Sequence, residues 1–508
     1  MIQTDFLVIG SGIAGLSFAI KASKFGRVAI VTKEGIKDSN TSFAQGGLAA
    51  VFSKDDSFEM HIKDTLRAGD GLCNKKAVEV LVKNAKKEIK WLIGQGVKFD
   101  FDNSHLALSK EAVHSMARIV HSGDITGKRV EDALAERILN NDKIKVYENH
   151  IAFELIKDKK DCIGARALDT KKQKIVDFFS CNTIIATGGI GRIYKKNTNP
   201  KTATGEGIAA AFLLGAEVQD MEFMQFHPTL LYNSNPAFLI SETLRGEGGL
   251  LKNRFGQTYM EKYHRDGVLA PRDVVSKFTV EEMKKTKSRF VYLDVRHLGS
   301  EYLRKRFPTI ADECMKYKID ITKQMIPVVP AAHYICGGIK TDLNGKTNIK
   351  NLYAIGECAC TGLHGADRLA SNSLVEGLVF STRLADFIKK NGKAIKTKKL
   401  REVKIERFSK KNMEKYLQSV MWDYVGITRN IRGLSYALRE IKKMHDKLEK
   451  RGISRELIEI KGMLIVAGLI AKSALMRKES RGTHFFDEYP RRDDKLWLKH
   501  TVIDNRKY

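Results

Sequence analysis

The chain has 508 residues, of which 43% are hydrophobic and 29% charged, so we expect a globular protein of two or three domains rather than a disordered or fibrous one. Lys and Arg number 88 against 60 Asp and Glu, but the lysines are scattered in twos and threes without a patch, which argues against a nucleic-acid partner. No apolar run is long enough to cross a membrane and no secretory leader is evident, so we expect no membrane partner.

The number and spacing of the cysteines indicate the redox environment and the metal sites to expect. Seven cysteines at irregular spacing exclude a disulfide framework and predict a reducing, cytoplasmic location. Cys358 and Cys360 lie two apart, but no second cysteine pair or histidine cluster completes a tetrahedral site, so no metal is predicted.

The N-terminal pattern predicts a doubly wound α/β domain. A buried strand at 5–9, a helix at 13–24 and a strand at 27–32 form a βαβ unit. Alternating apolar segments at 144–185 predict a meander that rejoins the parallel sheet. Further helices are expected at 57–69, 76–94, after residue 128, and at 205–216, 413–424, 430–451 and 454–477.

These elements predict three domains. A discontinuous α/β Rossmann-like domain takes residues 1–221 and 335–395, and an inserted α+β capping domain takes 222–334. A separate C-terminal helical bundle takes 400–508.

A glycine-rich turn indicates a dinucleotide cofactor. Gly10, Gly12 and Gly15 lie between the first strand and helix, where backbone amides can approach a pyrophosphate. The acid expected about 20 residues later, against a ribose, is either Glu34 or is replaced by Lys33. The motif alone does not choose between FAD and a nicotinamide cofactor.

Three later segments make that choice: residues 40–47 (NTSFAQGG), 186–189 (ATGG) and 355–357 (IGE). Here the sequence resembles the succinate dehydrogenase and fumarate reductase flavoprotein superfamily, which implies an FAD-binding Rossmann-like domain. Members with covalent flavin carry His at the position of Asn40, so FAD is expected to be non-covalent. Glu206 stands where relatives usually carry Asp. The resemblance assigns to the cofactor Ser11, Gly12, Ile13, Ala14, Lys33, Asn40, Thr41, Ser42, Phe43, Ala44, Gln45, Gly46, Gly47, Ile151, Ala152, Glu206, Glu357, Ser373 and Leu374.

Five segments carry groups suited to a buried dicarboxylate, which needs fixed cationic or hydrogen-bonding partners. They are residues 225–229 (QFHPT), 241–248 (SETLRGEG), 269–273 (LAPRD), 330–334 (PAAHY) and 365–373 (GADRLASNS).

The resemblance implies that the substrate carboxylates are held by His227, Ser241, His333 and Arg368. Arg272 is the superfamily's acid or base beside the reacting carbons, and two roles for it stay open, in aspartate oxidation or only in fumarate reduction. Arg245 belongs either to the site or to an ion pair with Glu242 or Glu247.

Narrower features resemble the L-aspartate oxidase family. They are residues 110–115 (KEAVHS), 421–427 (MWDYVGI) and 477–484 (RKESRGTH). The first implies that Glu111 meets the substrate ammonium, an attraction that a low-dielectric pocket strengthens. Ala112 and Val113 stand where that family more often has two glycines, so we expect a less flexible loop.

The resemblance implies oxidation of L-aspartate to iminoaspartate with O2 or fumarate as electron acceptor, the first step towards NAD through quinolinate. Quinolinate synthase is then an implied partner. A soluble fumarate reductase or succinate dehydrogenase flavoprotein is the alternative, because it shares nearly all the substrate motifs, although Asn40, Glu111 and the Trp422 segment argue against it. A non-catalytic basic protein is disfavoured by the complete set of site motifs.

Overall fold

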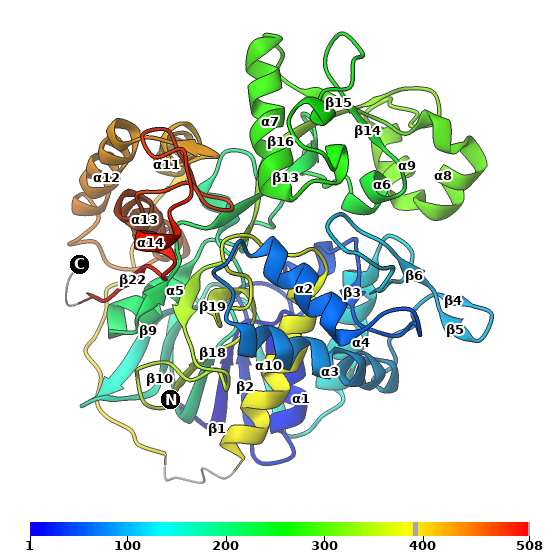
Figure 1. Ribbon diagram of the computed structural model, residues 1–508. Helices are drawn as coiled ribbons and strands as arrows, with labels where there is room; N and C mark the ends of the chain where they lie inside the picture. Colours follow the sequence, from blue (N-terminus) through cyan, green and yellow to red (C-terminus); the bar gives the residue numbers. More distant parts are fainter. Residues whose placement is uncertain (390–394, 506–508) are drawn as a thin grey trace.

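A computed structural model describes residues 1–389 and 395–505, and its centre is a seven-stranded sheet of order β8-β2-β1-β11-β10-β9, with β18 also paired to β11 (Figure 1). Strands β8, β2, β1, β11 and β18 are parallel, whereas β9, β10 and β11 form an antiparallel meander. The predicted βαβ start and meander are thus confirmed. The strands are β1 (Ile2–Ile9), β2 (Val28–Val31), β8 (Ile144–Tyr147), β9 (His150–Asp158), β10 (Asp161–Asp169), β11 (Lys174–Ile185) and β18 (Leu352–Ala354).

Both faces of this sheet are covered, which explains the continuous apolar run of β1. Phe6 and Val8 pack into one core with the helices of one face, and Leu7 and Ile9 pack into the core of the other face. The first face carries α1 (Ile13–Ala22), α3 (Lys75–Gly94), α4 (Thr126–Leu139) and α10 (Asn372–Ile388), with α2 (Phe58–Ala68) against α3, and the second carries α5 (Glu206–Leu214).

Short strands fix the loops around this layer. Two small sheets join β3 (Leu48–Ala49), β7 (Ile119–Val120) and β6 (Leu108–Ser109), and β4 (Phe101–Asp102) with β5 (His105–Leu106). A third has the order β19 (Ala359–Cys360), β17 (Gly338–Lys340), β12 (Val218–Gln219) and β22 (Val502–Ile503), so the end of the described chain returns to the central part.

The segment between β12 and β17 folds over the carboxyl ends of the central strands, at the top of Figure 1. It has its own core, which includes Leu244, Leu293 and Phe307. Its antiparallel sheet has the order β13 (Met224–Leu231), β16 (Ile326–Ile335), β15 (Val291–Asp294) and β14 (Leu250–Lys252), and its helices are α6 (Glu242–Gly246), α7 (Arg272–Lys285), α8 (Ser300–Arg306) and α9 (Pro308–Lys316).

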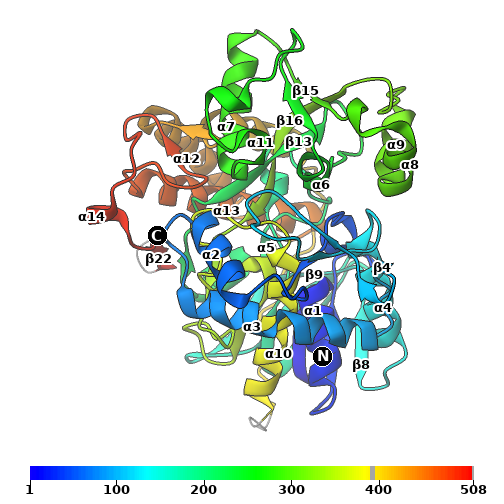
Figure 2. The ribbon, with the colours of Figure 1, turned by 45° about the vertical axis from the view of Figure 1, so that its right-hand side comes forward.

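The C-terminal helices lie beside the sheet, in the orange and red part of Figures 1 and 2. They share one core with α5 and the second face of the sheet, so the C-terminal helices pack directly against the central domain. The reason is that 16 of the 22 residues of α13 are buried, which requires neighbours on every side. The elements are α11 (Lys411–Tyr424), β20 (Thr428–Arg429), α12 (Ile431–Asp446), α13 (Arg455–Met476), β21 (Phe485–Phe486) and α14 (Asp494–Trp497).

Within the described residues, 1–389 and 395–505, no helix is long and apolar enough to cross a membrane. The predicted junction near residue 395 and the predicted end at 508 include positions 390–394 and 506–508, which lie outside the described residues.

A buried ion network ties the C-terminal segment to the start of β13. Arg477 Nε donates to Glu222 Oε1 at 2.6 Å, and Arg477 Nη1 donates to Glu479 Oε1 at 2.7 Å. Glu479 also accepts from Arg481 Nε at 2.7 Å. All four side chains are fully buried, so each charge depends on its partners.

Replacing Glu479 with Gln tests this dependence. The change leaves two buried guanidinium groups short of negative charge, and we expect the free energy of unfolding to fall by about 3 kcal/mol. Chemical denaturation measures the change. The matched substitution Glu449→Gln, at an exposed position of the same region, is expected to change that free energy by less than about 0.5 kcal/mol, and equal effects of the two would contradict the account.

Candidate active site

A cavity of about 540 Å³ lies between the carboxyl ends of the central strands and the segment above them. Its volume is typical of a small-molecule site. Every residue that the sequence assigned to cofactor or substrate lines it, from Ser11 at one end to Arg272 and His333 at the other. Residues that sequence reasoning did not assign to the site also line it: Glu242, Tyr334, Thr198, Asn199, Pro200 and Ser371.

The glycine-rich turn forms the floor of this cavity. Gly10 has a φ of +115°, and a Cβ there would lie 2.2 Å from the carbonyl oxygen of Ala186. A Cβ on Gly15 would lie 2.2 Å from the oxygen of Gly10. Thr41 Oγ1 accepts from the amide of Ile13 at 2.9 Å, which joins the 40–47 segment to the start of α1. The turn therefore brings bare backbone to the cavity, as a pyrophosphate requires.

Lys33 and Glu34 differ in their partners and in their position relative to the cavity. Glu34 pairs with Arg455 and does not line the cavity. Lys33 lines it and donates to Glu206 Oε1 at 2.7 Å. Glu206 also lines the cavity, so a carboxylate of α5, held by Lys33, is present at this end. Oε1 of Glu459, on α13, lies 3.6 Å from Nζ of Lys33. The C-terminal helices therefore lie next to this end of the site.

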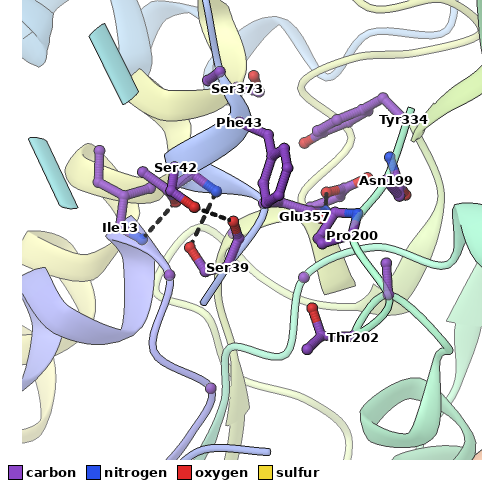
Figure 3. A pocket seen from close by; sticks show the side chains of 18 of the residues that line it. Ile13, Ser39, Ser42, Phe43, Asn199, Pro200, Thr202, Tyr334, Glu357 and Ser373 are labelled. Atoms are coloured by element: carbon purple, nitrogen blue, oxygen red, sulfur yellow. Dashed lines mark hydrogen bonds between the residues drawn. The ribbon is translucent and has the colours of Figure 1, made fainter. Parts of the chain in front are cut away.

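Several polar atoms in the middle of the cavity have no protein partner. Asn40 Oδ1 and Gln45 Oε1 are buried and form no hydrogen bond with any described residue. Asn40 donates through Nδ2 to Glu357 Oε2 at 3.1 Å, and burial raises the pKa of Glu357 to about 7. Phe43 is 52% exposed although it lines a pocket, and Figure 3 shows its ring among Glu357, Pro200 and Tyr334. Such unpaired atoms and a bare ring fit a large, partly polar ring system.

Two arginines converge on one amide oxygen at the far end. Arg272 Nη1 and Arg368 Nη2 both donate to Gln225 Oε1, at 2.9 and 3.1 Å. Arg368 Nη1 donates to Ser373 Oγ at 3.0 Å, its face lies 4.4 Å from the ring centre of Tyr334, and its Nε has no hydrogen-bond partner. Within the described chain Arg368 forms no ion pair, so its charge remains available to an anion.

Two histidines, His227 and His333, lie edge to face beside these arginines, with ring centres 5.2 Å apart and an interplanar angle of 63°. Burial, and then the positive charges nearby, hold the pKa of His227 and of His333 well below the ordinary value, so both are neutral. His333 Nδ1 is hydrogen-bonded to Thr198 Oγ1 at 2.7 Å, whereas His227 Nε2 has no partner among the described residues. His227 Nε2 can therefore serve a bound molecule.

Glu242 links Arg272 to Arg245. Arg272 Nε donates to Glu242 Oε2, and Arg245 Nη2 lies 3.3 Å from Glu242 Oε1. Burial raises the pKa of Glu242, but the two arginines outweigh burial and the net shift is downward, so Glu242 stays ionised. Arg245 lines no part of the cavity, and of its two expected partners it pairs with Glu242. Ser241, beside them, caps α6 and accepts from the amide of Thr243 at 3.3 Å.

Glu111 is a further carboxylate of the cavity, and its Oε1 accepts a long hydrogen bond of 3.5 Å from Thr243 Oγ1, next to Ser241 and Glu242. It is 4% exposed and accepts from Ser371 Oγ at 2.6 Å. A Cβ on Gly46 would lie 2.8 Å from Glu111 Oε1, so the carboxylate lies directly against the 40–47 segment. Burial, followed by the charge on Glu242, raises the pKa of Glu111. Two residues later, Val113 has a φ of +70°, a region that branched side chains avoid.

The comparisons with known proteins agree with this geometry. Residues 5–374 match the family model described as FAD binding domain, and residues 414–508 match fumarate reductase flavoprotein C-term. A variant of Escherichia coli quinol fumarate reductase FrdA superposes with a TM-score of 0.92 at 31% identity, over 99% of this chain and 94% of that one. "L-aspartate oxidase, chloroplastic" of Oryza sativa subsp. japonica is 42% identical over 96% of this chain and 82% of its own length. L-aspartate oxidase of Yersinia pestis is 40% identical over 96% of both.

The chain belongs to the L-aspartate oxidase family. It is accordingly an FAD-dependent oxidoreductase, with an FAD-binding α/β domain and a C-terminal helical domain. The unpaired oxygens of Asn40 and Gln45, the bare ring of Phe43 and the turn at Gly10 all fit FAD. Asn40 cannot form the histidyl bond of the covalent members of the superfamily.

Among the residues that sequence reasoning missed, Gln225 and Glu242 contact Arg272 directly. They stood inside segments recognised for their histidine and arginine, and no spacing rule brings them to Arg272. The available signals were a polar side chain two residues before His227, for Gln225, and an acid near arginines, for Glu242. In the described part of the chain, no group of three or more His, Cys, Asp and Glu is arranged to hold a metal ion.

Gly10→Ala tests the floor of the cavity. Left-handed strain and the clash with Ala186 should together cost about 3 kcal/mol or more, and the purified variant should carry little FAD. Gly96→Ala is the matched control, because Gly96 also has a positive φ, of +103°, but nothing lies within 4 Å of its Cβ position. It should cost about 1–2 kcal/mol and keep the flavin. Flavin content and thermal unfolding report both effects, and normal flavin in Gly10→Ala would refute the assignment.

Proposed function

We propose that this protein oxidises L-aspartate to iminoaspartate with FAD as cofactor and with O2 or fumarate as the final electron acceptor. The observation that carries the proposal is Glu111, a buried carboxylate in the same cavity as two substrate-facing arginines. The reaction would supply the first step of NAD biosynthesis through quinolinate. A fumarate reductase or succinate dehydrogenase flavoprotein, the alternative, has no use for this second carboxylate.

The arginine end would bind the two substrate carboxylates. Arg368 offers a buried guanidinium without an ion-pair partner in the described chain. His227 Nε2 forms no hydrogen bond with a described residue, and Glu242 Oε2 lies 3.9 Å from it. His333 and Ser241 complete the set of polar groups at this wall. A dianion entering here would gain charge-assisted hydrogen bonds and would in turn compensate the positive charge.

Glu111 would distinguish L-aspartate from succinate. The two molecules differ by one ammonium group, and an ionised carboxylate in a closed pocket attracts it. Ser371 donates to Oε2 of Glu111, and Oε1 faces Gly46 of the cofactor segment. The amine of a bound substrate would then be held between its carboxylates and the flavin.

The chemistry needs little from the protein beyond binding and orientation. When bound, FAD supplies the acceptor for the two electrons that leave the substrate. L-Aspartate loses a hydride from Cα and protons from its nitrogen, and the electrons finally convert O2 to hydrogen peroxide or fumarate to succinate. Arg272 would lie over the reacting carbons, with Glu242 holding its orientation. Whether Arg272 moves a proton in aspartate oxidation or only in fumarate reduction stays as two hypotheses.

The cofactor contacts that we propose follow the lining of the cavity. Residues Ser11, Gly12, Ile13 and Ala14 would approach the pyrophosphate, and Lys33 with Glu206 the ribose end. The segment from Asn40 to Gly47, with Glu357, Ser373 and Leu374, would surround the flavin ring and its side chain, and Ile151 with Ala152 would contact the adenosine half.

We also propose the domain division 1–221 with 335–395, 222–334, and 400–508. The separate core of the middle segment supports an inserted α+β capping domain, and the chain passes into and out of it through β13 and β16.

Two further points stay predictions of the sequence: quinolinate synthase as the consumer of iminoaspartate, and a cytoplasmic location.

Glu111→Gln tests the amine site. The substitution keeps the size of the side chain and removes its charge, so the KM for L-aspartate should rise about tenfold or more. The dissociation constant of succinate should change little. Hydrogen peroxide formation and flavin absorbance measure the two, and equal weakening of both ligands would count against the role of Glu111.

The pH dependence follows from the same residue. Burial raises the pKa of Glu111, so it becomes neutral as the pH falls through that raised value and no longer attracts the ammonium. The KM for L-aspartate should therefore rise towards acid in the native protein, and this rise should vanish in Glu111→Gln. A persistent acid rise in the variant would assign the titration to another group.

A further inference from the structure

The loop that carries Glu111 is joined to the segment that carries Arg368 by two hydrogen bonds. Ser371 Oγ donates to Glu111 Oε2 at 2.6 Å. His114 Nε2 and the carbonyl oxygen of Ala370 are 3.0 Å apart. The bond from Ser371 involves Glu111, the residue of the proposed amine site. His114 lines no part of the cavity, so it can act on the site only through its neighbours.

The partners of His114 determine which of its nitrogens carries hydrogen. Arg118 Nη1 lies 3.0 Å from His114 Nδ1, and a guanidinium has donors only, so Nδ1 accepts. The neutral ring then carries its hydrogen on Nε2 and donates it to Ala370. Arg118 itself is fully buried and ion-paired with Asp56 at 2.8 Å and with Asp64 at 2.6 Å. His114 is thus held between a fixed cation and the backbone of the Arg368 segment.

The backbone between Glu111 and His114 is strained, and the hydrogen bond from His114 to Ala370 helps to hold it. Val113 has a φ of +70°, which is costly for a branched side chain and persists only when surrounding contacts impose it. The bonds of Glu111 and His114 flank it on either side. Without the His114 bond, the loop could relax at Val113 and carry the Glu111 carboxylate with it.

We propose that His114 is a positioning residue, which fixes the Glu111 carboxylate relative to Arg368 and thereby sets the preference for L-aspartate over succinate. This inference rests on the proposed function of Glu111. A ligand held at both its carboxylates and its amine requires both protein groups at a set separation, whereas succinate requires only the arginine end.

His484 provides a matched control elsewhere in the molecule. It is also fully buried, its Nδ1 lies 2.8 Å from Arg429 Nη1, and its Nε2 lies 3.2 Å from the carbonyl oxygen of Arg477. The same arrangement of arginine, histidine and carbonyl therefore occurs without contact to Glu111 or to the cavity. Loss of a buried histidine as such can be separated from loss of His114.

The experiment compares His114→Asn, His114→Gln and His484→Asn in the flavin-loaded protein. Asn can still accept from the buried arginine, which protects folding, but is too short to reach the carbonyl oxygen, whereas Gln can reach both. The readout is the ratio of kcat/KM for L-aspartate to the association constant of succinate. We expect His114→Asn to lower this ratio about tenfold, His114→Gln to restore most of it, and His484→Asn to leave it unchanged.

A native ratio in His114→Asn, or an equal fall in His484→Asn, would overturn the inference. Glu111→Gln, measured in parallel, separates this failure from failure of the proposed function. If Glu111→Gln lowers the ratio and His114→Asn does not, only the positioning role is wrong. If Glu111→Gln leaves the ratio native, the amine site is wrong and the inference falls with it. Should His114→Asn not fold, His114→Gln decides, because Gln keeps both hydrogen bonds and a ratio lowered to the level of Glu111→Gln would contradict the claim that these bonds position Glu111.

Discussion

The structure depends on positive charge that is buried and only partly compensated. Arg272 is paired with Glu242, but Arg368 has no ion-pair partner within the described chain, and the two guanidinium groups share a single amide oxygen of Gln225. Such charge is expensive to remove from water unless an anion completes it. The surrounding elements are arranged to keep it in place: β13 and β16 present the histidines, α7 begins at Arg272, and α10 follows the Arg368 segment. This arrangement supports the proposal that a dicarboxylate binds beside the two arginines.

We propose that Glu111 gives the site its preference for L-aspartate over succinate. Glu242 compensates the arginines and stays ionised, whereas Glu111 lies away from any direct ion pair among the described residues and has a raised pKa. The same residue type thus serves two purposes, set by its neighbours. Glu242 forms an ion pair with Arg272, whereas Glu111 has no ion-pair partner among the described residues, which supports its proposed contact with the substrate ammonium.

Much of this arrangement could be predicted from the sequence, because the motifs are local. The turn at Gly10 lies between a strand and a helix, and the apolar run of β1 predicted a strand buried on both faces. The pairing of Lys33 with Glu206 could not be predicted, since it joins residues 173 positions apart. The hydrogen bond from His114 to Ala370 joins residues 256 positions apart, so it could not be predicted either. The core that α13 shares with the central sheet could not be predicted either, because periodicity indicates a helix but not which neighbours cover it.

The most direct test of the account is anaerobic. The protein is purified with its flavin, and the flavin absorbance is recorded after addition of L-aspartate or of succinate. The account predicts rapid bleaching by L-aspartate and none, or far slower bleaching, by succinate, because only the first ligand brings an ammonium to Glu111. Bleaching by succinate alone would contradict the account and would make the protein a dicarboxylate dehydrogenase.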